Sequence, residues 1–232
     1  MGVIVIIGVI LLGVLFWVMQ VNLKKIKEIA ENESLDKIAD KYPENRIICE
    51  EILKKVNNDQ VIIEEDQEAN TTMYLAIPNK IKIANLKGNY TRIQTIAHEC
   101  LHSIQNRRLL VANVVVSNLY LLFFIITFVV SCIPQVQGKQ VLSCVLALLG
   151  LSYYMIRAYL ENDAMIKARY LAKEYMEEKK CSTDEEIGLL VNQYDKLNDL
   201  GIRCVNFQLF SGVMIKVILV ALIGWGIESF FS

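Results

Sequence analysis

The sequence contains only two histidines, and they stand four residues apart at His98 and His102. It shows no internal repeat and no low-complexity tract, and it has three prolines. Its 24 basic and 25 acidic residues leave a formal net charge of -1, which gives no reason to expect a nucleic acid as a partner. None of the six cysteines belongs to a C-x-x-C pair, so a disulfide framework is not predicted.

Hydrophobic residues are what the chain has in excess. They make up 54% of it, and the mean hydropathy of +0.36 is too high for an ordinary soluble domain and too low for a chain wholly in lipid. A helix needs about 20 apolar residues to cross roughly 30 Å of hydrocarbon. Four apolar runs approach this length, at residues 3–19, 109–133, 141–156 and 213–231. The first run has no basic segment before it and no cleavage site, so we expect a retained anchor.

Basic residues are placed unevenly around these runs. Lysines and arginines follow the first and third runs and precede the second, whereas the link at residues 134–140 carries one lysine. By the positive-inside rule, both termini face outward and the active part is cytoplasmic, in a multi-pass protein of the cell membrane. The predicted divisions are an anchor at 1–21, a cytoplasmic α/β segment at 22–108, a transmembrane hairpin at 109–157, a cytoplasmic helical segment at 158–211 and a transmembrane helix at 212–232.

The first cytoplasmic segment is predicted to mix helices with short strands. The stretch before Pro43 is charged and can continue the first membrane helix as a stalk, and "ENRIICEEILKKVNN" is typical of an amphipathic helix. "QVIIEE" and residues 73–77 and 80–84 are strand candidates. Because lysine and isoleucine alternate over 80–84, we expect a sheet edge there. An edge strand beside the histidine helix can hold a peptide substrate extended by strand addition.

The stretch "HECLH" carries the chemistry. Residues four apart lie on one face of an α-helix, so His98 and His102 can present both imidazoles to one zinc ion. Glu99 comes next around the helix and can act as general base on a zinc-bound water, which is the mechanism of the HExxH metalloprotease helix. Cys100 points away from the histidines and is expected in the core. The alternative is that the motif is accidental and the chain is a membrane adaptor without a metal.

A catalytic zinc site usually has three protein ligands, and the chain has no third histidine. The third ligand must then be a carboxylate or a cysteine. Glu161 and Asp163 are the best candidates, because the hairpin of the second and third runs brings residues 157–163 close to the histidine helix. His102 lies about nine residues farther from the hairpin tip than Glu161, or ~13 Å for straight helices. A break or bend near residues 107–113, or a differently placed hairpin tip, is therefore predicted.

These residues carry a family resemblance. From about Glu44 to the fourth run, the chain resembles the neutral zinc metallopeptidases of bacterial membranes, the YugP-like family. "AHECLHSIQ" is similar to the family's A-H-E-x-G-H-A-x-Q, and "ENDA" is similar to its E-x-D-A-S box. Leu101 and Met165 stand where the family has glycine and serine, and Gln105 matches. The resemblance implies three zinc ligands (His98, His102 and Glu161), a general base (Glu99), and a carboxylate that orients a ligand histidine (Asp163).

The sequence therefore predicts a mainly α membrane protein with four transmembrane helices and a small α+β zincin-like unit. The expected function is zinc-dependent hydrolysis of peptide bonds, with a protein or peptide as substrate and the lipid bilayer as surroundings. The alternative is an inactive zinc-binding scaffold. A fourth protein ligand, such as Cys100 or Asp163, would favour the scaffold, and an open position would favour the enzyme.

Overall fold

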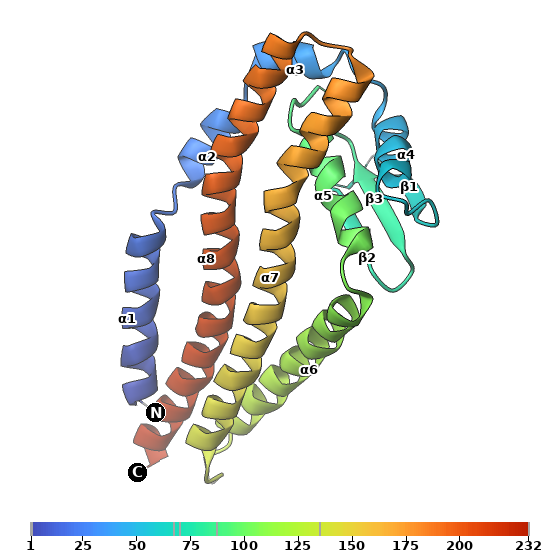
Figure 1. The fold of residues 1–232 in the computed structure, drawn as a ribbon. Helices are drawn as coiled ribbons and strands as arrows, with labels where there is room; N and C mark the ends of the chain where they lie inside the picture. Colours follow the sequence, from blue (N-terminus) through green and yellow to red (C-terminus); the bar gives the residue numbers. More distant parts are fainter. Residues whose placement is uncertain (1, 67, 70, 87, 135, 232) are drawn as a thin grey trace. The chain divides into compact units, whose positions relative to one another are not determined.

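A computed structural model defines the fold and describes residues 2–66, 68–69, 71–86, 88–134 and 136–231 (Figure 1). The chain is mainly helical, with 75% of it in helices and a small sheet of three strands, which confirms the predicted class. In chain order the elements are α1 (Gly2–Met19), α2 (Leu23–Ala30), α3 (Glu33–Ala39), α4 (Asn45–Lys55), β1 (Ile62–Asp66), β2 (Met73–Leu75), β3 (Lys80–Ala84), α5 (Arg92–Ile104), α6 (Arg107–Ser131), α7 (Lys139–Lys179) and α8 (Asp184–Phe231).

The chain divides into two compact units. Unit 1 consists of Met1–Val21, Ala112–Tyr159 and Arg203–Ser232, and unit 2 of Asn22–Val111 and Leu160–Ile202. Helices α6, α7 and α8 each contribute one part to each unit, whereas α2 to α5 and the sheet belong to unit 2 alone.

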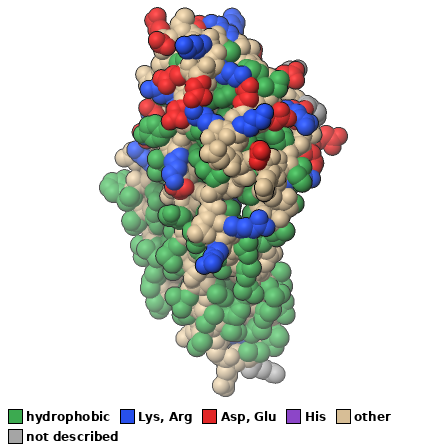
Figure 2. Space-filling model, turned by 45° about the vertical axis from the view of Figure 1, so that its right-hand side comes forward, with side chains coloured by type: hydrophobic (Ala, Val, Ile, Leu, Met, Phe, Trp, Pro, Cys, Tyr) green, Lys and Arg blue, Asp and Glu red, His purple; other side chains and the backbone are tan. Residues whose placement is uncertain are grey.

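Unit 1 holds the apolar runs. Within the described residues, four helices are long and apolar enough to cross a membrane, and they begin in α1, α6, α7 and α8. This is consistent with a multi-pass membrane protein. On the face drawn in Figure 2, hydrophobic side chains cover these helices, while most charged side chains belong to unit 2. Tyr120 and Val213 belong to the small core of the unit, and Gly150 lets both side chains approach the α7 backbone.

The predicted stalk does not form. Helix α1 ends at Met19, Gln20 adopts a left-handed backbone conformation with φ of 49°, and α2 starts afresh at Leu23. The side chain of Asn22 accepts a hydrogen bond from the Lys25 N–H and so caps the new helix. The first N–H groups of a helix have no carbonyl partner within the helix, and an asparagine side chain in this position satisfies one of them.

The sheet confirms the three predicted strands but corrects the position of one. Its order is β1-β3-β2, with β3 parallel to β1 and antiparallel to β2, so Lys80–Ala84 is the central strand and not an edge. The alternation of lysine and isoleucine reflects the two faces of this strand and not a position at the edge of the sheet. Ile81 and Ile83 are buried, while Lys80 and Lys82 lie on the other face and pair with Glu64 of β1. The edge strand that packs against α5 is β2.

Helix α5 lies in the middle of unit 2, against α4, β2 and β3. Its apolar side chains join one buried cluster with residues of α4, the sheet, α7 and α8. The predicted chain break is present just before the expected stretch. The chain leaves the helix at Gln105, which has an extended backbone, and the Asn106 side chain accepts from the Arg108 N–H to start α6. This break separates the histidine helix from the long apolar helix that follows it.

Candidate metal centre

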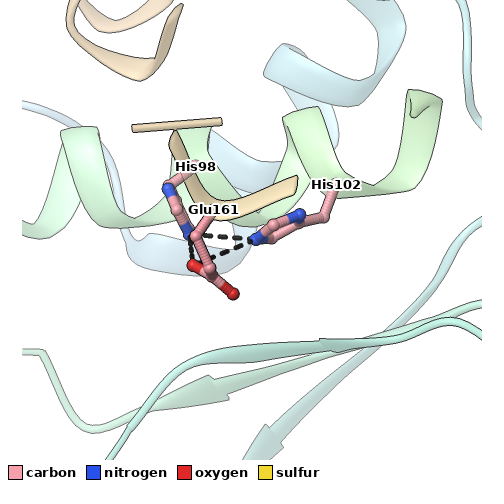
Figure 3. A group of neighbouring side chains, drawn as sticks. All are labelled: His98, His102 and Glu161. Carbon is pink, nitrogen blue, oxygen red and sulfur yellow. Dashed lines mark hydrogen bonds and ion pairs between the residues drawn. The ribbon is translucent and has the colours of Figure 1, made fainter. Parts of the chain in front are cut away.

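The two histidines of α5 point toward each other. Their Nε2 atoms lie 3.0 Å apart, and the rings are nearly perpendicular, with an interplanar angle of 87° (Figure 3). His102 is buried and His98 is half-buried. One helical turn thus places both imidazoles on one face, as the spacing predicts.

Helix α7 supplies the third donor. Glu161, also buried, directs its carboxylate between the two rings (Figure 3). Its Oε2 atom lies 3.4 Å from His98 Nε2 and 3.7 Å from His102 Nε2. Glu161, which is 59 positions from His102 in the chain, therefore converges with the histidines because α7 packs on α5 in the common core of unit 2.

The spacing of these donor atoms fits a small metal ion. A tetrahedral zinc ion with bonds of about 2.0–2.1 Å holds its ligand atoms roughly 3.3 Å apart. The three measured separations, 3.0, 3.4 and 3.7 Å, lie on either side of that value. In the part of the chain that the structure describes, the group that can hold a metal ion consists of these three residues. Two imidazoles and one carboxylate are a donor set that suits zinc.

The electrostatic surroundings also favour a cation. Burial alone would lower the pKa of His102, but the carboxylates of Glu161 and Glu99 outweigh it and raise that pKa. The imidazole therefore sits in a field of negative charge. A metal ion at the donor group would be stabilised by the same field.

Glu99 lies beside the three donors and is held by the sheet. Its Oε2 atom accepts a hydrogen bond from the backbone N–H of Tyr74 in β2 at 2.6 Å, and its Oε1 atom lies 4.0 Å from His98 Nε2. Burial raises the pKa of Glu99, against the opposing effect of the two histidines. A carboxyl with a raised pKa takes up a proton more readily, which is what a general base needs.

Asp163 reaches the histidines through another residue. Its Oδ2 atom accepts from the Gln105 side chain at 3.1 Å, and its Oδ1 atom pairs with Lys167 at 2.6 Å. Gln105 in turn lies 2.8 Å from the Nδ1 atom of His102. Sequence reasoning gave Gln105 no role, since it stands just past the end of a helix where no periodicity applies. The contact of Tyr74 was also missed, because a backbone N–H leaves no signal in the sequence.

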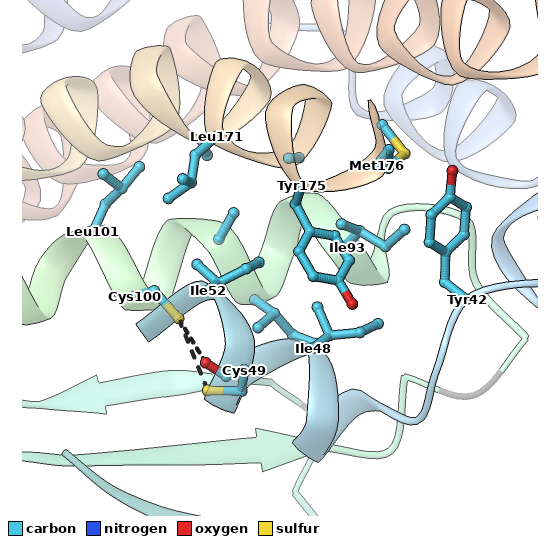
Figure 4. Packing of buried hydrophobic residues seen from close by; sticks show 14 of the residues in the cluster. Tyr42, Ile48, Cys49, Ile52, Ile93, Cys100, Leu101, Leu171, Tyr175 and Met176 are labelled. Carbon is cyan, nitrogen blue, oxygen red and sulfur yellow. Dashed lines mark hydrogen bonds between the residues drawn. The ribbon is translucent and has the colours of Figure 1, made fainter. Parts of the chain in front are cut away.

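Cys100 faces away from the donors, as expected. It is fully buried against α4, with its Sγ atom 3.8 Å from that of Cys49 (Figure 4). It is therefore not placed as a fourth ligand. Leu101 is buried in the same core as Leu171 of α7.

Met165 of α7 is accommodated by a glycine. A Cβ atom at Gly201 of α8 would lie 2.8 Å from the Cε atom of Met165, so the missing side chain makes room for the methionine. Asn198 of α8 donates to the Met165 carbonyl and accepts from Gln94 of α5. Leu101 and Met165 are thus both packed against neighbouring residues of unit 2.

Comparison of the chain with protein-family models, with curated proteins and with solved structures finds no match.

Proposed function

We propose that the chain is a multi-pass membrane peptidase that uses zinc to hydrolyse peptide bonds. The observation that supports this most strongly is the pairing of a three-donor group with a buried carboxylate. His98, His102 and Glu161 are spaced for one ion, and Glu99 is fixed next to them by Tyr74. A purely structural zinc site usually closes with a fourth protein ligand, whereas a catalytic site keeps a position open. The three-residue group favours the catalytic type.

Zinc held by these residues would polarise a substrate carbonyl and lower the pKa of water at the site. Glu99 moves the protons. With Oε2 held by the Tyr74 N–H, its Oε1 atom remains on the side of His98 and can accept a proton from the attacking water. Because burial raises the pKa of Glu99, the carboxyl can keep this proton until the leaving nitrogen takes it.

We place the substrate along β2. This strand is at the edge of the sheet, and the Tyr74 N–H donates to Glu99 instead of to β3. The edge of β2 that carries this N–H therefore faces Glu99. A peptide that adds to this edge as a further strand would lie extended next to Glu99. The placement of basic residues favours the cytoplasmic side of the membrane for this reaction.

The test compares zinc content and hydrolysis in four variants of the detergent-purified protein. His98→Ala and Glu161→Gln are expected to lose about one zinc per chain along with hydrolysis of a quenched fluorescent peptide library. Glu99→Gln is expected to keep zinc and lose hydrolysis. Glu174→Gln is the matched control, since it makes the same change in α7 at a side chain that is 60% exposed.

Two results would contradict the proposal in different ways. A folded native protein that takes up no zinc, even when zinc is supplied, would make the two histidines ordinary helix residues. Zinc bound through all three donors, with the native protein as inactive as Glu99→Gln on every peptide, would favour the scaffold alternative.

A further inference from the structure

The amide of Gln105 has only one chemically sensible orientation. Its Nε2 atom lies 2.8 Å from the backbone carbonyl oxygen of Leu160 and 3.1 Å from a carboxylate oxygen of Asp163. Both partners are acceptors, so the nitrogen end of the amide must face them. The oxygen end is then fixed toward His102, with Oε1 2.8 Å from the ring Nδ1 atom.

This orientation determines the tautomer of His102. An amide oxygen can only accept, so the Nδ1 atom of His102 must carry the hydrogen. In a neutral ring the Nε2 atom then keeps its lone pair, and this is the atom that faces His98 and Glu161. An unconstrained neutral histidine side chain prefers the opposite tautomer, with hydrogen on Nε2, which would point a hydrogen at the metal position.

Gln105 also connects the two helices that supply the donors. It follows the end of α5, and its side chain reaches the Leu160 carbonyl in α7, directly before Glu161. Asp163, on the same helix, accepts a hydrogen bond from the Gln105 amide and polarises it. An amide that donates to a carboxylate becomes a stronger acceptor at its oxygen, because hydrogen bonds in a chain reinforce one another. The expected result is a more basic Nε2 atom on His102.

We propose that Gln105 is a positioning residue, which holds His102 in its metal-binding tautomer and transmits the effect of Asp163 to that ring. The part of the proposal that concerns metal affinity rests on the function proposed above. The part that concerns the tautomer does not, since it follows from contacts of the protein alone.

The tautomer can be read directly by 15N NMR of histidine-labelled protein, because the chain contains only two histidines. The measurement uses the detergent-purified full chain without metal, at a pH where both rings are neutral, and a His98→Gln variant assigns the two rings. In the native protein, His102 is expected to carry its hydrogen on Nδ1. In Gln105→Met, which keeps the length of the side chain and removes its polar atoms, the hydrogen is expected to shift to Nε2.

A charge-swapped pair tests the link to Asp163. In Gln105→Glu the new carboxylate can accept from His102 but faces Asp163 and the Leu160 carbonyl without a donor, so the orientation is expected to be lost. Adding Asp163→Asn supplies an amide that can donate to Glu at position 105, and the double variant should restore the Nδ1–H tautomer. This pair also decides the question if Gln105→Met does not fold.

Zinc affinity, measured by competition with a chelator, is the second readout. Gln105→Met is expected to bind zinc about 10- to 100-fold more weakly, as is typical when a partner of a metal-binding histidine is removed. Gln94→Ala is the matched control. It also removes a buried glutamine contact of α5, to Asn198 of α8, yet it should leave the His102 tautomer unchanged.

The proposal is wrong if folded Gln105→Met keeps the native tautomer and binds zinc within twofold of the native protein. It is equally wrong if Gln94→Ala shifts the tautomer as far as Gln105→Met, because the effect would then be general loosening of α5. If the native protein shows the Nδ1–H tautomer but no peptide hydrolysis, the role of Gln105 stands and the proposed peptidase activity fails.

Discussion

Shortening Glu161 by one methylene group is the most direct test of the metal geometry. Glu161→Asp keeps the carboxylate and its charge, but withdraws it along the side chain by up to about 1.5 Å, the length of one carbon–carbon bond. The Oε2 separations of 3.4 and 3.7 Å from the two Nε2 atoms would then grow to as much as about 4.9 and 5.2 Å. Ligand atoms of one zinc ion lie roughly 3.3 Å apart, so the aspartate could not reach the ion unless α7 moved.

The expected effect is a large loss of zinc affinity. Without its third ligand the site resembles a two-histidine site, and we expect zinc to bind at least ~100-fold more weakly, which corresponds to about 2.8 kcal/mol. The assay is competition with a chelator of known affinity in detergent. Glu174→Asp, the same change at an exposed position of α7, is the control and should have no effect. Native-like affinity in Glu161→Asp would refute the reasoning, because a site this sensitive to distance cannot tolerate the shift.

Three further predictions concern catalysis, packing and pH. Glu99→Gln should bind zinc within a few-fold of the native protein and hydrolyse peptides about 10²- to 10⁴-fold more slowly, the usual contribution of a general base, as single-turnover rates would reveal. Gly150→Ala puts a Cβ atom 2.5 Å from a side chain of α8 and should destabilise the protein by ~1–3 kcal/mol, whereas Gly212→Ala, with open space around it, should not lower the melting temperature in detergent. Burial alone would raise the pKa of Glu51, but its contact with Lys179, together with the Tyr175 hydrogen bond and the charge of Lys54, outweighs this and lowers it. The folded-state pKa is therefore below the unfolded one, so this contact stabilises the fold above the unfolded pKa and is lost as pH falls through the folded one; Glu51→Gln should lower the melting temperature at neutral pH and lose that effect in acid.

The parts of the fold that could be predicted are those with a local periodic signal. The four apolar runs, the amphipathic α4 and the histidine helix all follow from hydrophobic spacing, because each buries one face or is apolar and long enough to cross a bilayer. The alternation over Lys80–Ala84 correctly predicts a strand with one face exposed to solvent. The prediction that this strand lies at the edge of the sheet is wrong, because it is the central strand. Side-chain alternation indicates which face of a strand is buried. Which strands lie beside it in the sheet depends on the path of the rest of the chain.

The candidate site also contains residues whose positions could be predicted from the sequence and residues whose positions could not. His98 and His102 are neighbours through one helical turn, so their juxtaposition follows from the sequence. The nearness of Glu161 could be anticipated from the hairpin, but only with a chain break whose position was misplaced by a few residues. Gln105 lies in that break, at an extended residue between two helices. Its role depends on a carbonyl of α7 and on the end of α5 together, and no property of its own neighbourhood in the sequence indicates either.

The sequence does explain why α7 can approach α5 closely enough. Three alanines, Ala164, Ala168 and Ala172, repeat at intervals of four along α7, and all are fully buried in the core that contains Ala97 of α5. Residues four apart form one stripe on a helix, and small side chains on such a stripe permit short distances between helix axes. The stripe begins one turn after Glu161. A bulkier face at these positions would hold the carboxylate beyond reach of the imidazoles, so the spacing of the three donors depends on alanines that are not among them.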